Sequence, residues 1–283
     1  MKLERLTQRG RPAPWLYLFG VIAWTWTFLG IAAMTGQSLL AFPTVILAIL
    51  GGLGPIIVSA TLIRAGYWDP ALDRTALGFL GRVFDPRTLP WRWYLWITGL
   101  VIILAVLPVL LDGAGLPEQG LLDVGPGFFL IAGLLGALEE PGWRGYAQEA
   151  LQRRLPVVVA SLIIGVFWAA WHLPLFFIAD TYQAGLGVGT AAFWAFQLAL
   201  IAGSPVYAWL YNAAGRVPFA AVLYHALGNL ARELVPDVSN VAEVGVEALI
   251  AVVVILAAWS LMRVPRPPAS TVPKGARAED RAG

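Results

Sequence analysis

Long apolar stretches separated by short polar segments run along most of this 283-residue chain. A helix needs about 20 mostly apolar residues to cross the hydrocarbon core of a bilayer. Eight stretches approach that length, and they are Trp15–Met34, Phe42–Ile63, Tyr94–Leu111, Phe128–Leu151, Val157–Ile178, Val188–Tyr211, Val217–Leu230 and Val244–Met262. The pattern predicts an all-α fold, a polytopic membrane bundle of about eight transmembrane helices, in which the seventh helix has the weakest hydropathy.

The basic residues test this helix count independently. If the N-terminus lies in the cytoplasm and the helices alternate in direction, all 19 Lys and Arg residues except Arg232 fall in cytoplasmic segments. An excess of Lys and Arg is typical of the cytoplasmic side of a membrane, so we expect both termini in the cytoplasm. The abundance of Arg over Lys, together with much Ala and Gly, favours a bacterial source. The predicted location is therefore the bacterial cytoplasmic membrane.

Two parts of the chain are not expected to span the membrane. Asp69–Arg82 has the pattern of a short amphipathic helix on the cytoplasmic surface, with Trp91 and Trp93 as interfacial anchors. A plain solvated loop is the alternative for this segment. Residues 263–283 are rich in Pro and polar side chains, which predicts a disordered cytoplasmic tail. Residues 1–262 would then form a single transmembrane helical domain.

The composition excludes several classes of protein. The chain is 59% hydrophobic and 13% charged, with a mean hydropathy of +0.73, which excludes an ordinary soluble globule and a disordered chain. It has no Cys, so disulfides, thiolate metal sites and Cys nucleophiles are excluded. The net charge is +2, and the basic residues are scattered over loops, so nucleic acid is not an expected partner.

Charged residues gather in the fourth apolar stretch, where Glu139 and Glu140 are adjacent. A charge inside a spanning segment costs on the order of 2.5–3.5 kcal/mol on insertion scales, so such residues mark candidate functional sites. Arg144 follows Glu140 by four residues, one helical turn on, and can pair with that carboxylate. A purely structural ion pair is the alternative interpretation.

The chain has two His residues, His172 and His225, and each lies in an apolar stretch. Asn229 follows His225 by four residues, which places both on the same face of a helix. A lone His in a membrane helix often serves as a hydrogen-bonding group between helices. Combined with Glu139, however, these side chains supply a base, an acid and polar donors from three helices, which predicts an active site.

Three local motifs carry a family resemblance. They are EEPGWR at Glu139–Arg144, WAAWH at Trp168–His172 and HALGN at His225–Asn229. In this order and on successive helices, they resemble the CPBP family of intramembrane endopeptidases, also called the type II CAAX prenyl protease or ABI family. That family more often has Phe at the position of Trp168. The resemblance covers about residues 90–230, the motif-bearing core of the predicted domain.

The resemblance implies hydrolysis of a peptide bond inside a membrane cavity. By this comparison Glu139 is the general base that activates water, aided by His172. His225 and Asn229 are the pair that stabilises the tetrahedral oxyanion.

The neighbouring residues are expected to play supporting parts. Glu140 is expected to pair with Arg144 and to hold the end of their helix in place. Pro141 and Gly142 are expected to loosen that helix and to open a cavity toward the cytoplasm, and the alternative is that a Pro and a Gly are simply tolerated in a spanning helix. Trp168 is expected to serve as packing or as a cavity wall.

The sequence leaves the need for a metal open. Glu139, His172 and His225 would satisfy a catalytic zinc site with one open position. The HExxH motif is absent, however, and Asn229 is a poor zinc ligand. The same residues serve a metal-free glutamate mechanism, which we favour, so no cofactor is firmly implied and a divalent metal such as zinc is the alternative.

Two further functions are compatible with buried charges in a membrane bundle. One is a non-catalytic membrane scaffold or bacteriocin-immunity protein. The other is a proton-coupled transporter, although the chain has neither inverted repeats nor paired broken helices. For the protease, the expected partners are membrane lipid and a peptide or lipidated protein substrate. The scissile bond, the oligomeric state and the biological role do not follow from the sequence.

Overall fold

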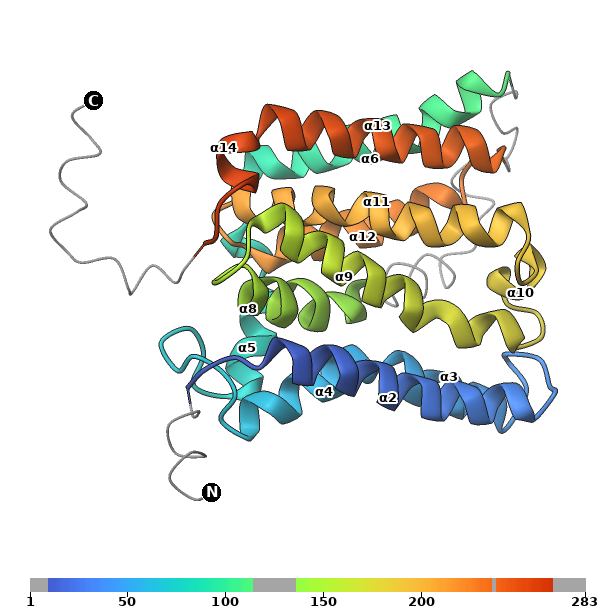
Figure 1. The fold of residues 1–283 in the computed structure, drawn as a ribbon, viewed down its shortest axis with the longest axis horizontal. Helices are drawn as coiled ribbons and strands as arrows, with labels where there is room; N and C mark the ends of the chain where they lie inside the picture. Colours follow the sequence, from blue (N-terminus) through green and yellow to red (C-terminus); the bar gives the residue numbers. More distant parts are fainter. Residues whose placement is uncertain (1–9, 114–135, 236–237, 267–283) are drawn as a thin grey trace, which may run out of the picture.

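The structure, a computed structural model, describes residues 10–113, 136–235 and 238–266 (Figure 1). Within these ranges the chain is helical and forms no strand beyond one isolated bridge, between Ser38 and Ala179. The elements are α2 (Pro14–Met34), α3 (Thr44–Gly52), α4 (Gly54–Arg64), α5 (Ala76–Val83), η1 (Pro86–Thr88), α6 (Trp91–Leu111), η2 (Pro141–Gln148), α8 (Glu149–Leu151), α9 (Val157–His172), η3 (Leu173–Phe177), α10 (Tyr182–Leu186), α11 (Ala191–Ala213), α12 (Pro218–Arg232), α13 (Asn240–Ala257) and α14 (Trp259–Met262). The all-α prediction is confirmed for the described residues.

The long helices lie side by side in layers (Figure 1). α2, α3 and α4 form one edge of the bundle, and α6 and α13 form the opposite edge. α9, α11 and α12 lie between these edges, with α11 packed against both α9 and α13. The short segment η2 contacts α2, α4, α5, α9, α11 and α12, so it lies at the centre of the packing.

In the described part of the chain, four helices are long and apolar enough to cross a membrane, judged by length and composition. They are Pro14–Met34, Trp91–Leu111, Val157–Phe177 and Ala191–Ala213. The count becomes five if the bent pair α3 and α4 is taken as one span. These helices indicate an integral membrane protein. The total of eight spans, the side on which the termini lie and the bacterial membrane stay predictions, and parts of the fourth stretch and of the tail lie outside the described residues.

The second predicted span is not one straight helix. α3 and α4 meet at Leu53 with a bend of 49°, where glycines and Pro55 interrupt the helical hydrogen bonds. Two side chains of α2 donate to carbonyl groups released there. Trp24 Nε1 lies 2.8 Å from the Leu50 oxygen, and Thr25 Oγ1 lies 2.8 Å from the Gly51 oxygen.

The segment after α4 also differs from its prediction. The predicted short helix is present, but it covers only α5, and residues 69–75 before it are not helical. α5 is amphipathic as predicted, because it buries Phe79 and Val83 in the core and exposes Leu77. Trp91 is exposed, as expected of an interfacial anchor. Trp93 is buried instead and packs edge-on against Trp209 of α11, with ring centroids 5.6 Å apart. Trp93 therefore joins α6 to the bundle.

Candidate functional site

The first motif leads into a π-helix. Residues 136–140 are α-helical, and η2 continues them with the wider i to i+5 hydrogen-bond pattern. π-helical turns are rare and are frequent at functional sites, because the extra residue turns side chains away from ordinary helical positions. Every residue of η2 is buried. The motif therefore lies in the middle of the protein and not on a loop.

Pro141 and Gly142 begin the π-helix, which agrees with the expected loosening of the helix, but among the described residues Gly142 faces packed side chains and not a cavity. A Cβ atom on Gly142 would lie 2.0 Å from the Tyr17 hydroxyl oxygen and 2.7 Å from Cβ of Pro55. Gly145 similarly faces Phe79 of α5, where a Cβ atom would lie 3.0 Å from the ring. These glycines let α2, α4 and α5 pack tightly on η2, so this side of the segment is closed.

A buried charged triad lies at the junction between the 136–140 helix and η2. Arg144 Nη1 donates to Glu140 Oε1 at 3.0 Å, and the two side chains are 1% and 0% exposed. This is the predicted ion pair. The same carboxylate oxygen lies 2.8 Å from Nδ1 of His225 on α12, which the motif spacing alone did not indicate. A carboxylate can only accept here, so Nδ1 of His225 carries the hydrogen.

Aromatic rings surround the guanidinium group of Arg144. Its Cζ atom lies 3.9 Å from the ring centroid of Tyr207 and 4.6 Å from that of Trp168. Ring faces attract a cation, and the attraction is stronger where water is excluded. Tyr207 also meets the His225 ring edge-on at 5.8 Å. Tyr207 is a site residue that sequence reasoning missed, because it belongs to none of the three motifs.

Glu139 has a different environment from Glu140. It is half-buried, and its Oε2 accepts a hydrogen bond of 2.7 Å from the indole Nε1 of Trp168. Trp168 was expected only to pack or to line a cavity, so this hydrogen bond corrects that expectation. The two adjacent carboxylates therefore differ, because Glu140 is neutralised by basic groups and Glu139 is held by a neutral donor.

His172 is fixed at the C-terminal end of α9. Its Nδ1 lies 2.9 Å from the backbone oxygen of Trp168, which can only accept, so the hydrogen lies on Nδ1 and Nε2 holds the lone pair in the neutral ring. The ring is 8% exposed and contacts Trp171 and Phe196 edge-on. Nε2 is thus the nitrogen that can accept a proton.

Gly136 lies against the third motif. A Cβ atom at Gly136 would lie 2.6 Å from Nδ2 of Asn229 and 2.8 Å from Cδ2 of His225. Only glycine lets the 136–140 helix approach this face of α12 so closely. The sequence signal for this residue was available, since Gly136 precedes Glu139 by three residues and therefore shares its helix face. The structure thus connects five of the predicted side chains through contacts with Trp168 and Glu140, and it places the sixth, Asn229, beside Gly136.

The side chains do not form a metal site in the described part of the chain. No three His, Asp or Glu side chains there are grouped closely enough to hold an ion. The zinc set of Glu139, His172 and His225 is therefore not assembled, and an indole N–H donor occupies one oxygen of Glu139. The residues as placed do not fit a zinc ion.

A second polar cluster anchors the far end of η2. Glu149 accepts hydrogen bonds from Arg216 and from the Tyr211 hydroxyl, the latter at 2.7 Å. Arg153 adds a contact of 3.3 Å and also reaches Asp69 at 3.3 Å. The cluster ties α8 to α11 and to two connecting segments. Its charges are paired with one another, so we assign it to stabilising the bundle.

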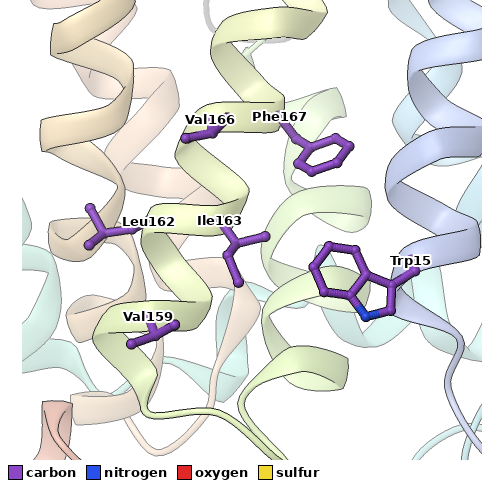
Figure 2. A pocket seen from close by; sticks show the side chains of 6 residues that line it. All are labelled: Trp15, Val159, Leu162, Ile163, Val166 and Phe167. Carbon is purple, nitrogen blue, oxygen red and sulfur yellow. The ribbon is translucent and has the colours of Figure 1, made fainter.

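A hollow on the outside of the bundle is distinct from this site. Figure 2 shows it between α2 and one face of α9, with a volume of about 330 Å³. Its lining is apolar and consists of Trp15, Val159, Leu162, Ile163, Val166 and Phe167. The hollow holds none of the polar side chains that peptide hydrolysis requires.

Comparison with known proteins supports the motif assignment. Residues 121–231 match the family model described as "Type II CAAX prenyl endopeptidase Rce1-like". The chain is 33% identical over 139 residues to "CAAX prenyl protease 2" of Methanococcus maripaludis, an alignment covering 47% of this chain and 50% of that protein. The chain thus spans about half the length of the curated relative it matches. The resemblance inferred from the three motifs is confirmed, and it supports an intramembrane endopeptidase.

Proposed function

We propose that this chain hydrolyses a peptide bond of a membrane-associated or lipidated substrate with a water molecule activated by Glu139. The observation that carries the proposal is the contrast between two adjacent carboxylates. Glu140 is fully buried between Arg144 and His225, whereas Glu139 is half-buried with one oxygen bonded to Trp168. Glu139 is thus the carboxylate that can meet water and substrate.

The first step is attack on the scissile carbonyl carbon. Glu139 takes a proton from water, and the water oxygen forms a bond to that carbon. The carbonyl π electrons move onto the oxygen, which becomes an oxyanion. His172 presents Nε2 as a second proton acceptor, because its Nδ1 is held by the Trp168 carbonyl group.

The oxyanion is stabilised by groups on α12. Glu140 accepts a hydrogen bond from Nδ1–H of His225 and so fixes the orientation of the ring, whose Nε2–H donates to the oxyanion when the ring is protonated. The Asn229 amide contributes a second donor from the next turn of the same face. A positioned donor of this kind is worth roughly 3–4 kcal/mol in comparable sites.

Collapse of the tetrahedral intermediate completes the reaction. The oxyanion re-forms the carbonyl group, the carbon–nitrogen bond breaks, and the protonated Glu139 gives its proton to the departing amine. Water supplies the hydroxyl group of the new carboxylic acid. The proposed steps use only side chains of this chain.

The comparisons and the membrane environment support a proposal for the substrate class. The relative from M. maripaludis is named a CAAX prenyl protease. A lipidated C-a-a-X peptide combines a membrane anchor with a scissile bond close to it. We therefore propose a lipid-anchored peptide as the substrate.

The experiment is cleavage of a quenched, lipidated C-a-a-X peptide by the detergent-purified protein. We compare the wild type with Glu139→Gln, and Glu233→Gln serves as a control at an exposed carboxylate after α12. The proposal predicts cleavage by the wild type and by Glu233→Gln, and none by Glu139→Gln. Equal cleavage by all three proteins would remove Glu139 from the mechanism. A cellular phenotype that survives Glu139→Gln would favour the non-catalytic scaffold.

A further inference from the structure

Trp168 is the residue through which the parts of the site meet. It lies on α9 and is 4% exposed. Its indole donates to Glu139, and its backbone oxygen lies 2.9 Å from Nδ1 of His172. Its ring meets the His225 ring edge-on at 5.4 Å and lies under the Arg144 guanidinium group. Trp168 is therefore in contact with residues of all three motifs.

The hydrogen bond from Trp168 fixes the Glu139 carboxylate in one orientation. The residues that the structure describes make no second hydrogen bond to this carboxylate. An indole N–H is a donor only and does not exchange roles with an acceptor. Trp168 can therefore hold Oε2 of Glu139 without competing for the water proton, which leaves Oε1 to receive it.

We propose that Trp168 is the positioning residue of the general base, which aims Oε1 of Glu139 at the attacking water. The inference rests on the function proposed above. The same residue places His172, since the carbonyl group that holds Nδ1 is its own. One turn of α9 thus sets the direction of both proton acceptors. A Phe at position 168 would keep the ring contacts but lose the hydrogen bond to Glu139.

The chain contains a matched control for this substitution. Trp171 lies on the same helix, is 5% exposed, and donates an equally short hydrogen bond of 2.7 Å from its indole. The acceptor is the Thr25 hydroxyl group of α2, not a carboxylate. Trp168→Phe and Trp171→Phe therefore remove the same donor from the same kind of buried site. The two substitutions differ in the hydrogen-bond acceptor that loses its donor, which is Glu139 for Trp168→Phe and Thr25 for Trp171→Phe.

The first test is the pH dependence of peptide cleavage. Trp168→Phe should lower kcat roughly tenfold and leave KM within about twofold, because a hydrogen bond to a charged group is lost while binding contacts stay. The pH profile of kcat should also change shape, since the hydrogen bond that holds the Glu139 carboxylate is lost. Trp171→Phe should leave the shape of the profile unchanged. Equal profiles for the two variants would overturn the proposal and reduce Trp168 to packing.

A second measurement needs no substrate. In protein labelled with ¹⁵N-tryptophan, the indole resonance of Trp168 is identified by its loss in Trp168→Phe. Glu139→Gln should move this resonance and leave that of Trp171 in place. If Glu139→Gln leaves the chemical shift of the Trp168 indole resonance unchanged, the hydrogen bond and the inference are refuted. If the resonance moves but the wild type cleaves no peptide, the proposed function fails, and with it the catalytic purpose of the contact.

Discussion

The imidazole of His225 and the carboxylate of Glu140 are joined by a contact of 2.8 Å between Nδ1 and Oε1, although 85 residues separate them in the chain. The same oxygen accepts from Arg144 at 3.0 Å. One buried carboxylate thus accepts hydrogen bonds from two basic side chains. Glu140 thus links the first motif to the third. The neighbouring residue in the chain, Glu139, is the carboxylate that we propose as the general base.

Glu140→Gln should destabilise the protein and impair cleavage together. The substitution leaves the buried Arg144 guanidinium group without its counter-charge, and removing one partner of a buried pair typically costs about 3–5 kcal/mol. It also withdraws the group that orients His225. Thermal unfolding in detergent and the cleavage assay measure the two effects.

Asp85→Asn is the control for that substitution. Asp85 pairs with Arg87, whose side chain is 88% exposed, and exposed pairs contribute little to stability. We expect its unfolding temperature to equal that of the wild type. An equal effect of Asp85→Asn and Glu140→Gln would contradict the central place given to the buried pair.

The sequence indicated candidate residues for the site but not their contacts. Hydropathy and helical spacing identified Glu139, His172 and His225, because a buried polar side chain stands out in an apolar helix. The partner of each depends on how helices distant in sequence pack. The hydrogen bond from Trp168 to Glu139 joins α9 to the 136–140 helix, and no local pattern encodes it.

For the fold, too, local features could be predicted from the sequence, and features that depend on distant partners could not. The length and the apolar composition of α2 and α11 predicted their bounds to within three residues. The break at Leu53 and the π-helix from Pro141 were not predicted. Both depend on partners elsewhere, since side chains of α2 satisfy the carbonyl groups freed at the break, and three helices close around Gly142 and Gly145.

Cleavage should continue in the presence of a strong chelator. The geometric reason is that Glu139, His172 and His225 are not grouped as the three ligands of an ion in the described structure. We expect the rate after exhaustive dialysis against chelator to equal the untreated rate. Loss of activity that returns on addition of zinc would show that these side chains rearrange around a metal, and would contradict the mechanism written above.

The contact between the ends of α6 and α13 should weaken in acid. The Ser239 hydroxyl donates to Asp112 Oδ1 at 2.7 Å, which holds the pKa of Asp112 below its ordinary value, and the Ser239 backbone N–H adds to the effect. A carboxyl whose pKa is lowered on folding stabilises the protein above its unfolded pKa and loses that contribution as pH falls through the folded value. The protection factors for hydrogen exchange at the start of α13 should therefore fall in acid.

Asp112→Asn isolates this contact, because the amide cannot titrate. In the variant, the protection factors at the start of α13 should be lower at neutral pH and should fall less on acidification than in the wild type. A wild type whose exchange in this segment follows only the intrinsic pH dependence of amide exchange would show that the Asp112 contact does not hold the two helices.

Gly136→Ala tests whether the close approach of two helices is required for catalysis. The new Cβ atom would lie 2.6 Å from Asn229 Nδ2 and 2.8 Å from His225 Cδ2, so one of the two side chains must move. A displacement near 1 Å at a reacting group can cost about 100-fold in rate, whereas overpacking costs about 1–3 kcal/mol of stability.

Gly228→Ala is the matched control, since nothing lies within 4 Å of a Cβ atom there and Ala is the better helix former. The assay should show roughly 100-fold slower cleavage by Gly136→Ala and wild-type cleavage by Gly228→Ala. Full activity of Gly136→Ala would mean that His225 and Asn229 act from positions other than those they occupy in this structure.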